Sequence, residues 1–205
     1  MAWPQITLER AVVLICTATV PGPHRLRLTV MTRRLFIFDD PDRFVPGTTG
    51  EPGERAFYLQ ARKGDAVVSV GIEKVQVAVL AERLDDLLDA VEAPMPAAAS
   101  ADAALEEPIV ELFRVGAMAL AWDAQRESVV IEAQTPTEDG EYAELPDDAE
   151  DGPDLLRVRI GPAEARAFVL RAEALLVAGR PACPFCGQPL EPTGHFCPRG
   201  NGQLN

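Results

Sequence analysis

The chain has 205 residues, of which 47% are hydrophobic and 25% charged, a composition typical of a globular protein with one large or two small domains. Its 19 basic and 32 acidic residues give a net charge of −13, which disfavours general binding to the phosphates of DNA or RNA. No stretch approaches the roughly 20 apolar residues of a membrane-spanning helix, so we expect no membrane partner.

The first 33 residues do not follow the pattern of a folded domain. A largely apolar run from Ala11 to Val20 leads to Pro21-Gly22-Pro23, and Met31 follows in the position of a start codon. We therefore interpret 1–33 as an extension or a mis-assigned start. Two alternatives stay open, a strand added to the fold and a secretory signal, although the leading region lacks the positive charge of a signal peptide.

From residue 34 the chain contains an internal repeat with an offset of 88 residues. Each copy begins with apolar residues at every second position, which is typical of a strand. Apolar residues at spacings of about four and seven follow, and they predict an amphipathic helix that packs on a sheet. The helical positions are Leu80, Leu84, Leu87, Leu88 and Val91 in the first copy and Phe168, Ala172, Leu175 and Leu176 in the second.

Three strands are predicted before each helix. They cover 34–39, 55–63 and 66–73 in the first copy, and 109–122, 127–134 and 155–160 in the second. Short turns such as Lys63-Gly64-Asp65 make neighbouring strands antiparallel. The prediction is an α+β domain over 34–179, in which two βββα pseudo-repeats, 34–92 and 109–179, form a mainly antiparallel sheet with packed helices.

The segments between these elements read as loops. We expect an inter-strand loop at 45–55, because Gly47, Gly50 and Gly53 permit turns there. The connector 93–108 is rich in Ala and Pro, and the connector 136–153 has eight acids and no Lys or Arg. We expect both connectors to be mobile surface loops.

The tail 180–205 carries the sharpest chemical signal. Cys183 and Cys186 form a C-x₂-C turn followed by Gly187, and His195 and Cys197 come shortly after it. Three thiolates and one imidazole make the tetrahedral ligand set of a structural Zn²⁺, which leaves no open position for catalysis. A redox C-x-x-C is the alternative, but the prolines around it oppose the required helix. Clustered thiols of this kind fit a reducing, cytoplasmic location.

These stretches together resemble the actinobacterial domain of unknown function 3090 family. The resemblance is carried by Phe36-Ile-Phe-Asp-Asp-Pro-Asp-Arg-Phe44, Gly50-Glu-Pro-Gly-Glu-Arg55, Leu59-Gln-Ala-Arg62, the segment from Glu73 to Leu84, and the segment from Cys183 to Asn201. It covers essentially all of 34–205 and implies no activity. Members similar to this chain begin near Met31, which favours the mis-start interpretation.

A second set of polar residues follows the first-copy strands and could form a ligand or partner surface; it consists of Arg43, Arg55, Arg62, Glu73, Lys74 and Gln76. With only two His, one of them assigned to zinc, the chain has little material for a Ser-His-acid triad. The leading hypothesis is therefore a non-enzymatic binding or adaptor protein whose partner is another protein. A small-ligand binder or enzyme that uses the Arg55, Glu73 and Lys74 cluster, and RNA binding through the zinc tail, are the alternatives.

Overall fold

The computed structural model describes residues 12–16, 32–51, 54–94, 104–178, 183, 185–187, 197 and 199, with the backbone alone for 12–16. One short strand, β1 (Val12–Cys16), precedes two successive units of four strands and one helix. The first unit contains β2 (Leu35–Asp39), β3 (Arg43–Thr49), β4 (Ala56–Lys63), β5 (Ala66–Ile72) and α1 (Lys74–Ala90). The second contains β6 (Glu111–Arg114), β7 (Ala117–Asp123), β8 (Ser128–Gln134), β9 (Leu155–Ile160) and α2 (Pro162–Val177).

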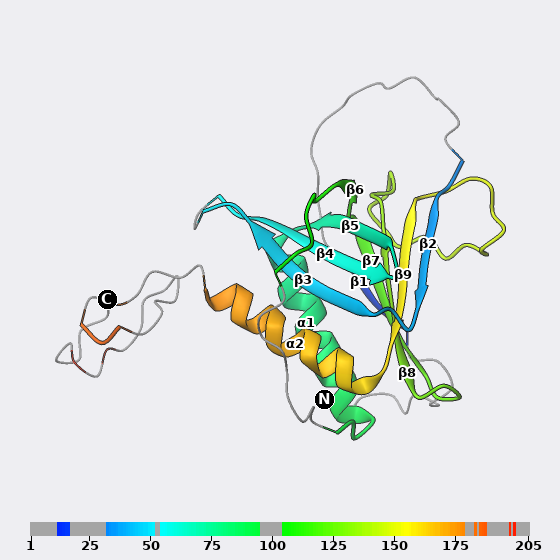
Figure 1. The fold of residues 1–205 in the computed structure, drawn as a ribbon. Coiled ribbons are helices and arrows are strands. Elements are labelled where there is room, and N and C mark those ends of the chain that lie inside the picture. The colour runs from blue at the N-terminus through cyan, green and yellow to red at the C-terminus, as the bar shows by residue number, and fades with distance from the viewer. Residues whose placement is uncertain are drawn as a thin grey trace.

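The strands form two sheets, and each unit contributes its first strand to the sheet of the other unit (Figure 1). In the four-stranded sheet, β3, β4 and β5 are antiparallel, and β6 joins them parallel to β5. In the five-stranded sheet, β7, β8 and β9 are antiparallel, and β2 joins them parallel to β9. β1 completes this sheet as the antiparallel neighbour of β7. The exchanged strands interlock the two units.

The helices lie side by side and pack against both sheets (Figure 1). α2 contacts β3 of the four-stranded sheet and β8 of the five-stranded sheet, and α1 contacts β1 and β7. Residues 88 positions apart are buried in both helices, as the repeat predicts; these pairs are Val77 and Ala165, Leu80 and Phe168, Ala81 and Val169, and Leu84 and Ala172. The Phe168 ring stacks on that of Phe44 in β3, with ring centroids 5.0 Å apart, and so joins α2 to the four-stranded sheet.

The described parts of both connectors are held against the outer faces of the sheets, which corrects the prediction of mobile surface loops. On β4, the buried Gln60 amide donates to the Glu106 carbonyl at 3.1 Å and accepts from the Glu106 N–H at 2.8 Å. On β8, the buried Gln134 makes the same pair of bonds with the backbone of Ala143, at 2.7 and 3.0 Å. In both places the side-chain amide makes the pair of hydrogen bonds that a neighbouring strand would make, and it pairs the N–H and C=O groups of the connector.

The α+β class, the mainly antiparallel pairing and the helices packed on sheet are confirmed. Each helix follows four strands, one more than expected, because β3 replaces part of the predicted loop and 109–122 divides into β6 and β7. β3 tolerates Pro46 because it is an edge strand, where a missing N–H costs less. Gly47 leaves room for Leu105, whose Cγ would lie 2.4 Å from a Cβ at that position.

Three further expectations concern the ends of the chain and the membrane. The backbone of 12–16 forms β1, as the added-strand alternative has it, and the rest of 1–31 lies outside the described residues. The domain boundaries at 33 and 179 stay a prediction. Neither helix within the described ranges is both long enough and apolar enough to cross a bilayer.

Candidate metal centre and pockets

Three of the four predicted zinc ligands converge. The Sγ atoms of Cys183, Cys186 and Cys197 all lie within 4.8 Å of one another, and those of Cys183 and Cys197 are 3.8 Å apart. Sulfur ligands at about 2.3 Å from one tetrahedral ion lie roughly 3.8 Å from each other, so this spacing fits a bound metal. The three thiols form no disulfide. The fourth predicted ligand, His195, lies outside the described residues.

The backbone around the cysteines is folded into turns that suit sulfur ligands. The N–H of Gly187 donates to the Cys183 carbonyl at 2.8 Å, and Gly187 has a φ of +75°, a conformation that glycine adopts without strain. The N–H of Arg199 donates to the Cys197 thiol and favours its ionised form, although burial of that side chain raises its pKa above the usual value. A cation between the sulfurs would supply the remaining stabilisation of the thiolates.

A small pocket forms where the first helix begins. It has a volume of about 300 Å³ and is lined by Arg55, Ala56, Phe57, Ile72, Glu73, Lys74, Arg114 and Leu175. Three of the six residues predicted as a ligand or partner surface therefore come together here. The fourth charged residue, Arg114, was not predicted; its guanidinium pairs with Glu73 at 2.9 Å and with Glu111 at 3.2 Å.

The other three predicted surface residues lie elsewhere. Arg43 and Arg62 are opposite each other on β3 and β4, and both approach the carboxylate of Glu106, at 3.5 and 3.3 Å. Gln76 is fully buried and has a structural role. Its amide oxygen accepts from the N–H of Glu73, and its amide nitrogen donates to the carbonyls of Val115 and Gly116, which ties α1 to the link between β6 and β7.

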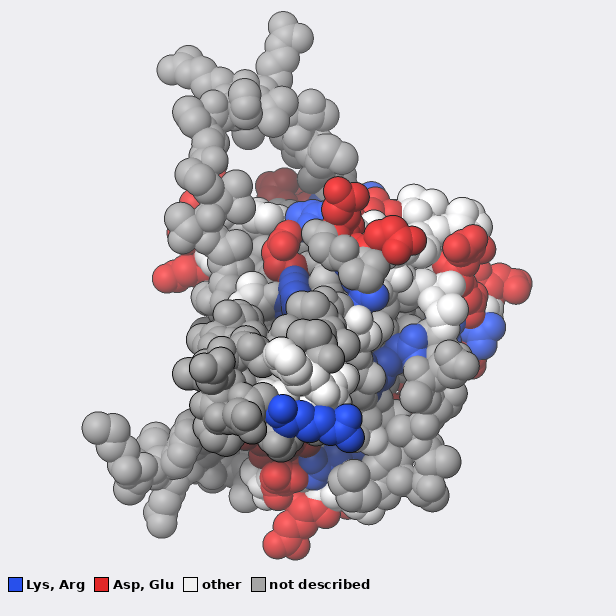
Figure 2. Space-filling view, turned by 90° about the vertical axis from the view of Figure 1, so that its left-hand side faces the viewer, with Lys and Arg blue, Asp and Glu red and all other residues white. Residues whose placement is uncertain are grey.

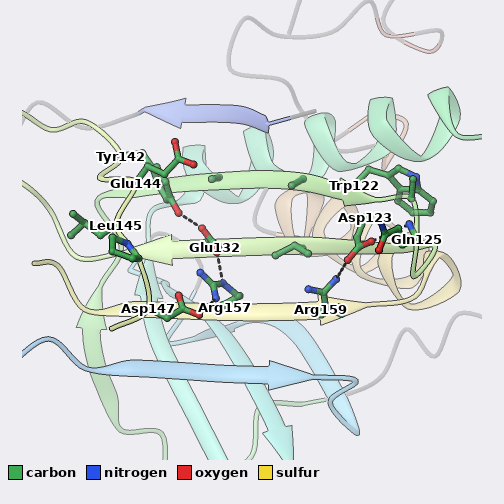
Figure 3. A pocket seen from close by; sticks show the side chains of 15 residues that line it. Trp122, Asp123, Gln125, Glu132, Tyr142, Glu144, Leu145, Asp147, Arg157 and Arg159 are labelled. Carbon is green, nitrogen blue, oxygen red and sulfur yellow. Dashed lines mark hydrogen bonds and ion pairs between the residues drawn. The ribbon is translucent and has the colours of Figure 1, made fainter. Parts of the chain in front are cut away.

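A larger cavity of about 1,030 Å³ lies on the outer face of the five-stranded sheet. The small outward side chains of Ala119 and Ala121 on β7 leave this space, and the connector that contains Tyr142 and Asp147 forms one wall. Figure 3 shows Tyr142, Glu144 and Leu145 at one end of the cavity and Trp122, Asp123 and Gln125 at the other.

Ion pairs fill the floor of this cavity. Arg157 on β9 binds Glu132 on β8 and reaches Asp147 at 2.8 Å, and Arg159 binds Asp123 at 2.7 Å (Figure 3). Burial lowers the pKa of Arg157, but its hydrogen bonds to Asp147 and Glu132 more than reverse this effect. None of these residues was predicted as part of a site. The signal was present in β8 and β9, where Glu132, Arg157 and Arg159 alternate with apolar residues and therefore point outward.

Neighbouring groups shift the pKa values of Tyr142, Asp123 and Asp147 in this cavity. Burial raises the pKa of the Tyr142 hydroxyl, and the hydrogen bond that it donates to Glu132 raises it further. The backbone N–H of Arg126 and the guanidinium of Arg159 lower the pKa of Asp123, and the guanidinium of Arg157 lowers that of Asp147. These shifts suit fixed charges more than proton transfer.

Residues 36–197 match a protein family described as "Protein of unknown function (DUF3090)". The chain belongs to the DUF3090 family. The matched range includes both units and the positions of the three clustered cysteines. No curated protein and no solved structure matches this DUF3090 chain, so its function has to be argued from the sites themselves.

Proposed function

We propose that this DUF3090 protein is a non-enzymatic binding protein whose C-terminal tail holds one structural Zn²⁺ and attaches the α+β body to another protein. The observation that carries the proposal is the convergence of the Cys183, Cys186 and Cys197 sulfurs to within 4.8 Å. Soft thiolates select Zn²⁺ over the harder divalent ions, and His195 completes the tetrahedron. With four protein ligands the ion has no open position, which makes its role structural.

An exposed aromatic side chain on the metal-binding turn supports the proposal that the tail binds another protein. Phe185 lies between two of the cysteines and is 53% exposed, and aromatic side chains in such positions are enriched at protein interfaces. Figure 2 supports a protein over a nucleic acid partner, because Asp and Glu side chains are interspersed with Lys and Arg side chains on the described part of the face that it draws. The net charge of −13 acts in the same direction.

Two further properties support a binding role in the cytoplasm. In the cavity on the five-stranded sheet, the pKa values of Asp123 and Asp147 are lowered and that of Tyr142 is raised, and shifts away from neutrality are unfavourable for general acid–base catalysis. The three clustered free thiols fit a reducing compartment, where thiols are not oxidised to disulfides.

The zinc content of the purified protein tests the metal. Wild-type protein prepared without chelator should contain close to one zinc per chain, and Cys186→Ser and His195→Ala should contain far less. Cys16→Ser is the matched control, since Cys16 is the remaining cysteine of the chain and is not a predicted ligand. Wild-type protein without zinc would contradict the proposal.

Partner recovery tests the binding role. The wild-type chain and the Phe185→Ala and Cys186→Ser variants are purified from a native host, and the captured proteins are compared by mass spectrometry. A protein recovered with the wild type and lost with Phe185→Ala and with Cys186→Ser supports attachment through the tail. Recovery of the same proteins with all three chains would contradict it.

A further inference from the structure

The 300 Å³ pocket at the start of α1 has a charge opposite to that of the whole molecule. Arg55, Lys74 and Arg114 line it together with Glu73, and Glu111 pairs with Arg114 beside it, so three cations meet two carboxylates in a chain whose net charge is −13. Since Asp and Glu outnumber Lys and Arg in this protein by 32 to 19, three cations around one small pocket form a local positive site.

The sheet topology explains why these cations meet. β4 and β5 are antiparallel, so Arg55, just before β4, lies at the edge where β5 ends. β5 and β6 are parallel, so Arg114, the last residue of β6, lies at the same edge, opposite Gly71. Lys74 begins α1 immediately after that edge.

The three cations differ in whether an acidic side chain already binds them. Arg114 is bound to Glu73 and Glu111. Within the described part of the chain, Arg55 and Lys74 form no ion pair. The N-terminus of α1 is closed by reciprocal hydrogen bonds between Glu73 and Gln76, so an anion would be held by the side chains and not by the helix end.

The second unit shows that the architecture does not need these charges. The corresponding junction between β9 and α2 is Gly161-Pro162, which carries no ionisable side chain. Both junctions connect the last strand of a unit to its helix, yet only the first is charged. The cluster is therefore an addition to the repeated fold.

We propose that this pocket binds a small organic anion, with a phosphate or carboxylate held by Arg55 and Lys74 and an apolar group against Phe57, Ile72 and Leu175. The volume lies at the lower end of the range for small-molecule sites. Guanidinium and ammonium groups bind both oxyanions through charge-assisted hydrogen bonds. The inference deepens the small-ligand alternative and is independent of the zinc tail.

The chain offers a direct probe, because it contains only two lysines, Lys63 and Lys74. Reductive methylation with ¹³C-formaldehyde labels both lysines and leaves them positively charged, so NMR resolves a signal at each. Lys63 lies at the β4–β5 turn, outside the pocket, and serves as the internal reference. The full-length protein is titrated with phenyl phosphate, benzoate, inorganic phosphate and neutral benzyl alcohol.

We expect phenyl phosphate or benzoate to shift the Lys74 signal saturably while the Lys63 signal stays in place. Arg55→Ala should weaken this binding about tenfold, and Glu73→Gln should strengthen it, because the neighbouring negative charge is removed. Arg83→Ala is the matched control, since Arg83 is an exposed cation of α1 outside the pocket. Arg55→Gln replaces Arg55→Ala if the latter does not fold.

Parallel shifts of both lysines, or equal weakening by Arg55→Ala and Arg83→Ala, would overturn the proposal. Binding of inorganic phosphate as tight as that of phenyl phosphate would also overturn it, because the apolar wall would then play no part. The comparison of phenyl phosphate with benzoate identifies the oxyanion. None of these readouts depends on the zinc content, so the two proposals fail separately.

Discussion

Arg166 joins the two helices through charge. Its guanidinium binds Asp85 and Asp89 on α1, and these partners place the start of α2 beside the end of α1. Only 7% of Arg166 is exposed, whereas both carboxylates are well solvated. Water therefore screens the ion pairs, and much of the stabilisation comes from the buried aliphatic stem of the arginine.

Arg166→Ala should lower the free energy of unfolding by about 1–2 kcal/mol, and Arg166→Met, which keeps an apolar stem, should lose less. Urea denaturation measures both changes. The control is Arg83→Ala, which removes an exposed pair with Asp86 and should change stability by no more than about 0.5 kcal/mol. An equal loss from Arg83→Ala and Arg166→Ala would show that burial of the stem does not matter.

Asp123 and Asp147, on the rim of the large cavity, make the stability of the fold decrease at low pH. The pKa of each is lowered, by the backbone N–H of Arg126 and by the guanidinium of Arg157 respectively. A lowered pKa in the folded state means that stability is complete above the unfolded value, about 3.9, and is lost as the pH falls further.

We therefore expect the urea midpoint to fall between pH 4 and pH 2.5, and Asp147→Asn to reduce this dependence. Arg157→Met, which removes the cation beside Asp147, should reduce it in the same way. If the urea midpoint depends on pH equally strongly in the wild type, Asp147→Asn and Arg157→Met, the ion pair between Asp147 and Arg157 does not cause the effect.

At the scale of the elements, an aromatic contact joins α2 to the four-stranded sheet. Phe168 is buried and stacks on Phe44 of β3, an interaction between residues that are far apart in the sequence. The helical spacing predicted that Phe168 faces the core, but no local pattern could identify Phe44 as its partner.

Phe168→Ala should cost about 3–5 kcal/mol, because it leaves a cavity between helix and sheet. A double-mutant cycle with Phe44→Ala should give a coupling of about 0.5–1.5 kcal/mol. Val75→Ala on the exposed side of α1 should change stability by less than about 0.5 kcal/mol. Additive losses from the two phenylalanines would argue against the stacking.

At the scale of the whole molecule, the exchanged strands make the two units depend on each other. β2 has its partner strand, β9, in the second unit, and β6 has its partner, β5, in the first. A unit expressed alone would expose one sheet edge and leave its own first strand unpaired.

We expect fragments 32–94 and 104–178 to show no cooperative melting when studied separately by circular dichroism. Mixing or co-expressing them should restore a folded spectrum, because both exchanged strands then find their partners. A cooperative transition in either isolated fragment would contradict this interdependence.

Zinc removal should act on the tail and leave the body folded. A structural zinc supplies about 10–16 kcal/mol of apparent folding energy to isolated metal-binding peptides, whereas the body has its own buried core. Hydrogen exchange should show lost protection in 180–205 after chelation or in Cys186→Ser, with protection of 35–178 retained. Global unfolding after chelation would contradict the separation.

What could be predicted from the sequence has a common physical origin. Side-chain periodicity decides which face of a helix or strand is apolar, so both helices and five of the strands followed from local spacing. Of the predicted helical positions, Leu80, Leu84, Leu88, Phe168 and Ala172 are buried, whereas Leu87, Val91, Leu175 and Leu176 are only partly buried. The short spacing of Cys183 and Cys186, with Cys197 eleven residues further, likewise predicted a sulfur cluster without knowledge of the fold.

Only the tertiary structure decided how the two units combine and where the pockets lie. The exchange of β2 and β6 depends on pairing between strands distant in the chain, and backbone hydrogen bonds of this kind carry no sequence pattern. For the same reason Arg114 joined Arg55 and Lys74 only when β6 aligned with β5, and the cavity beside Arg157 appeared only when the acidic connector folded over the sheet.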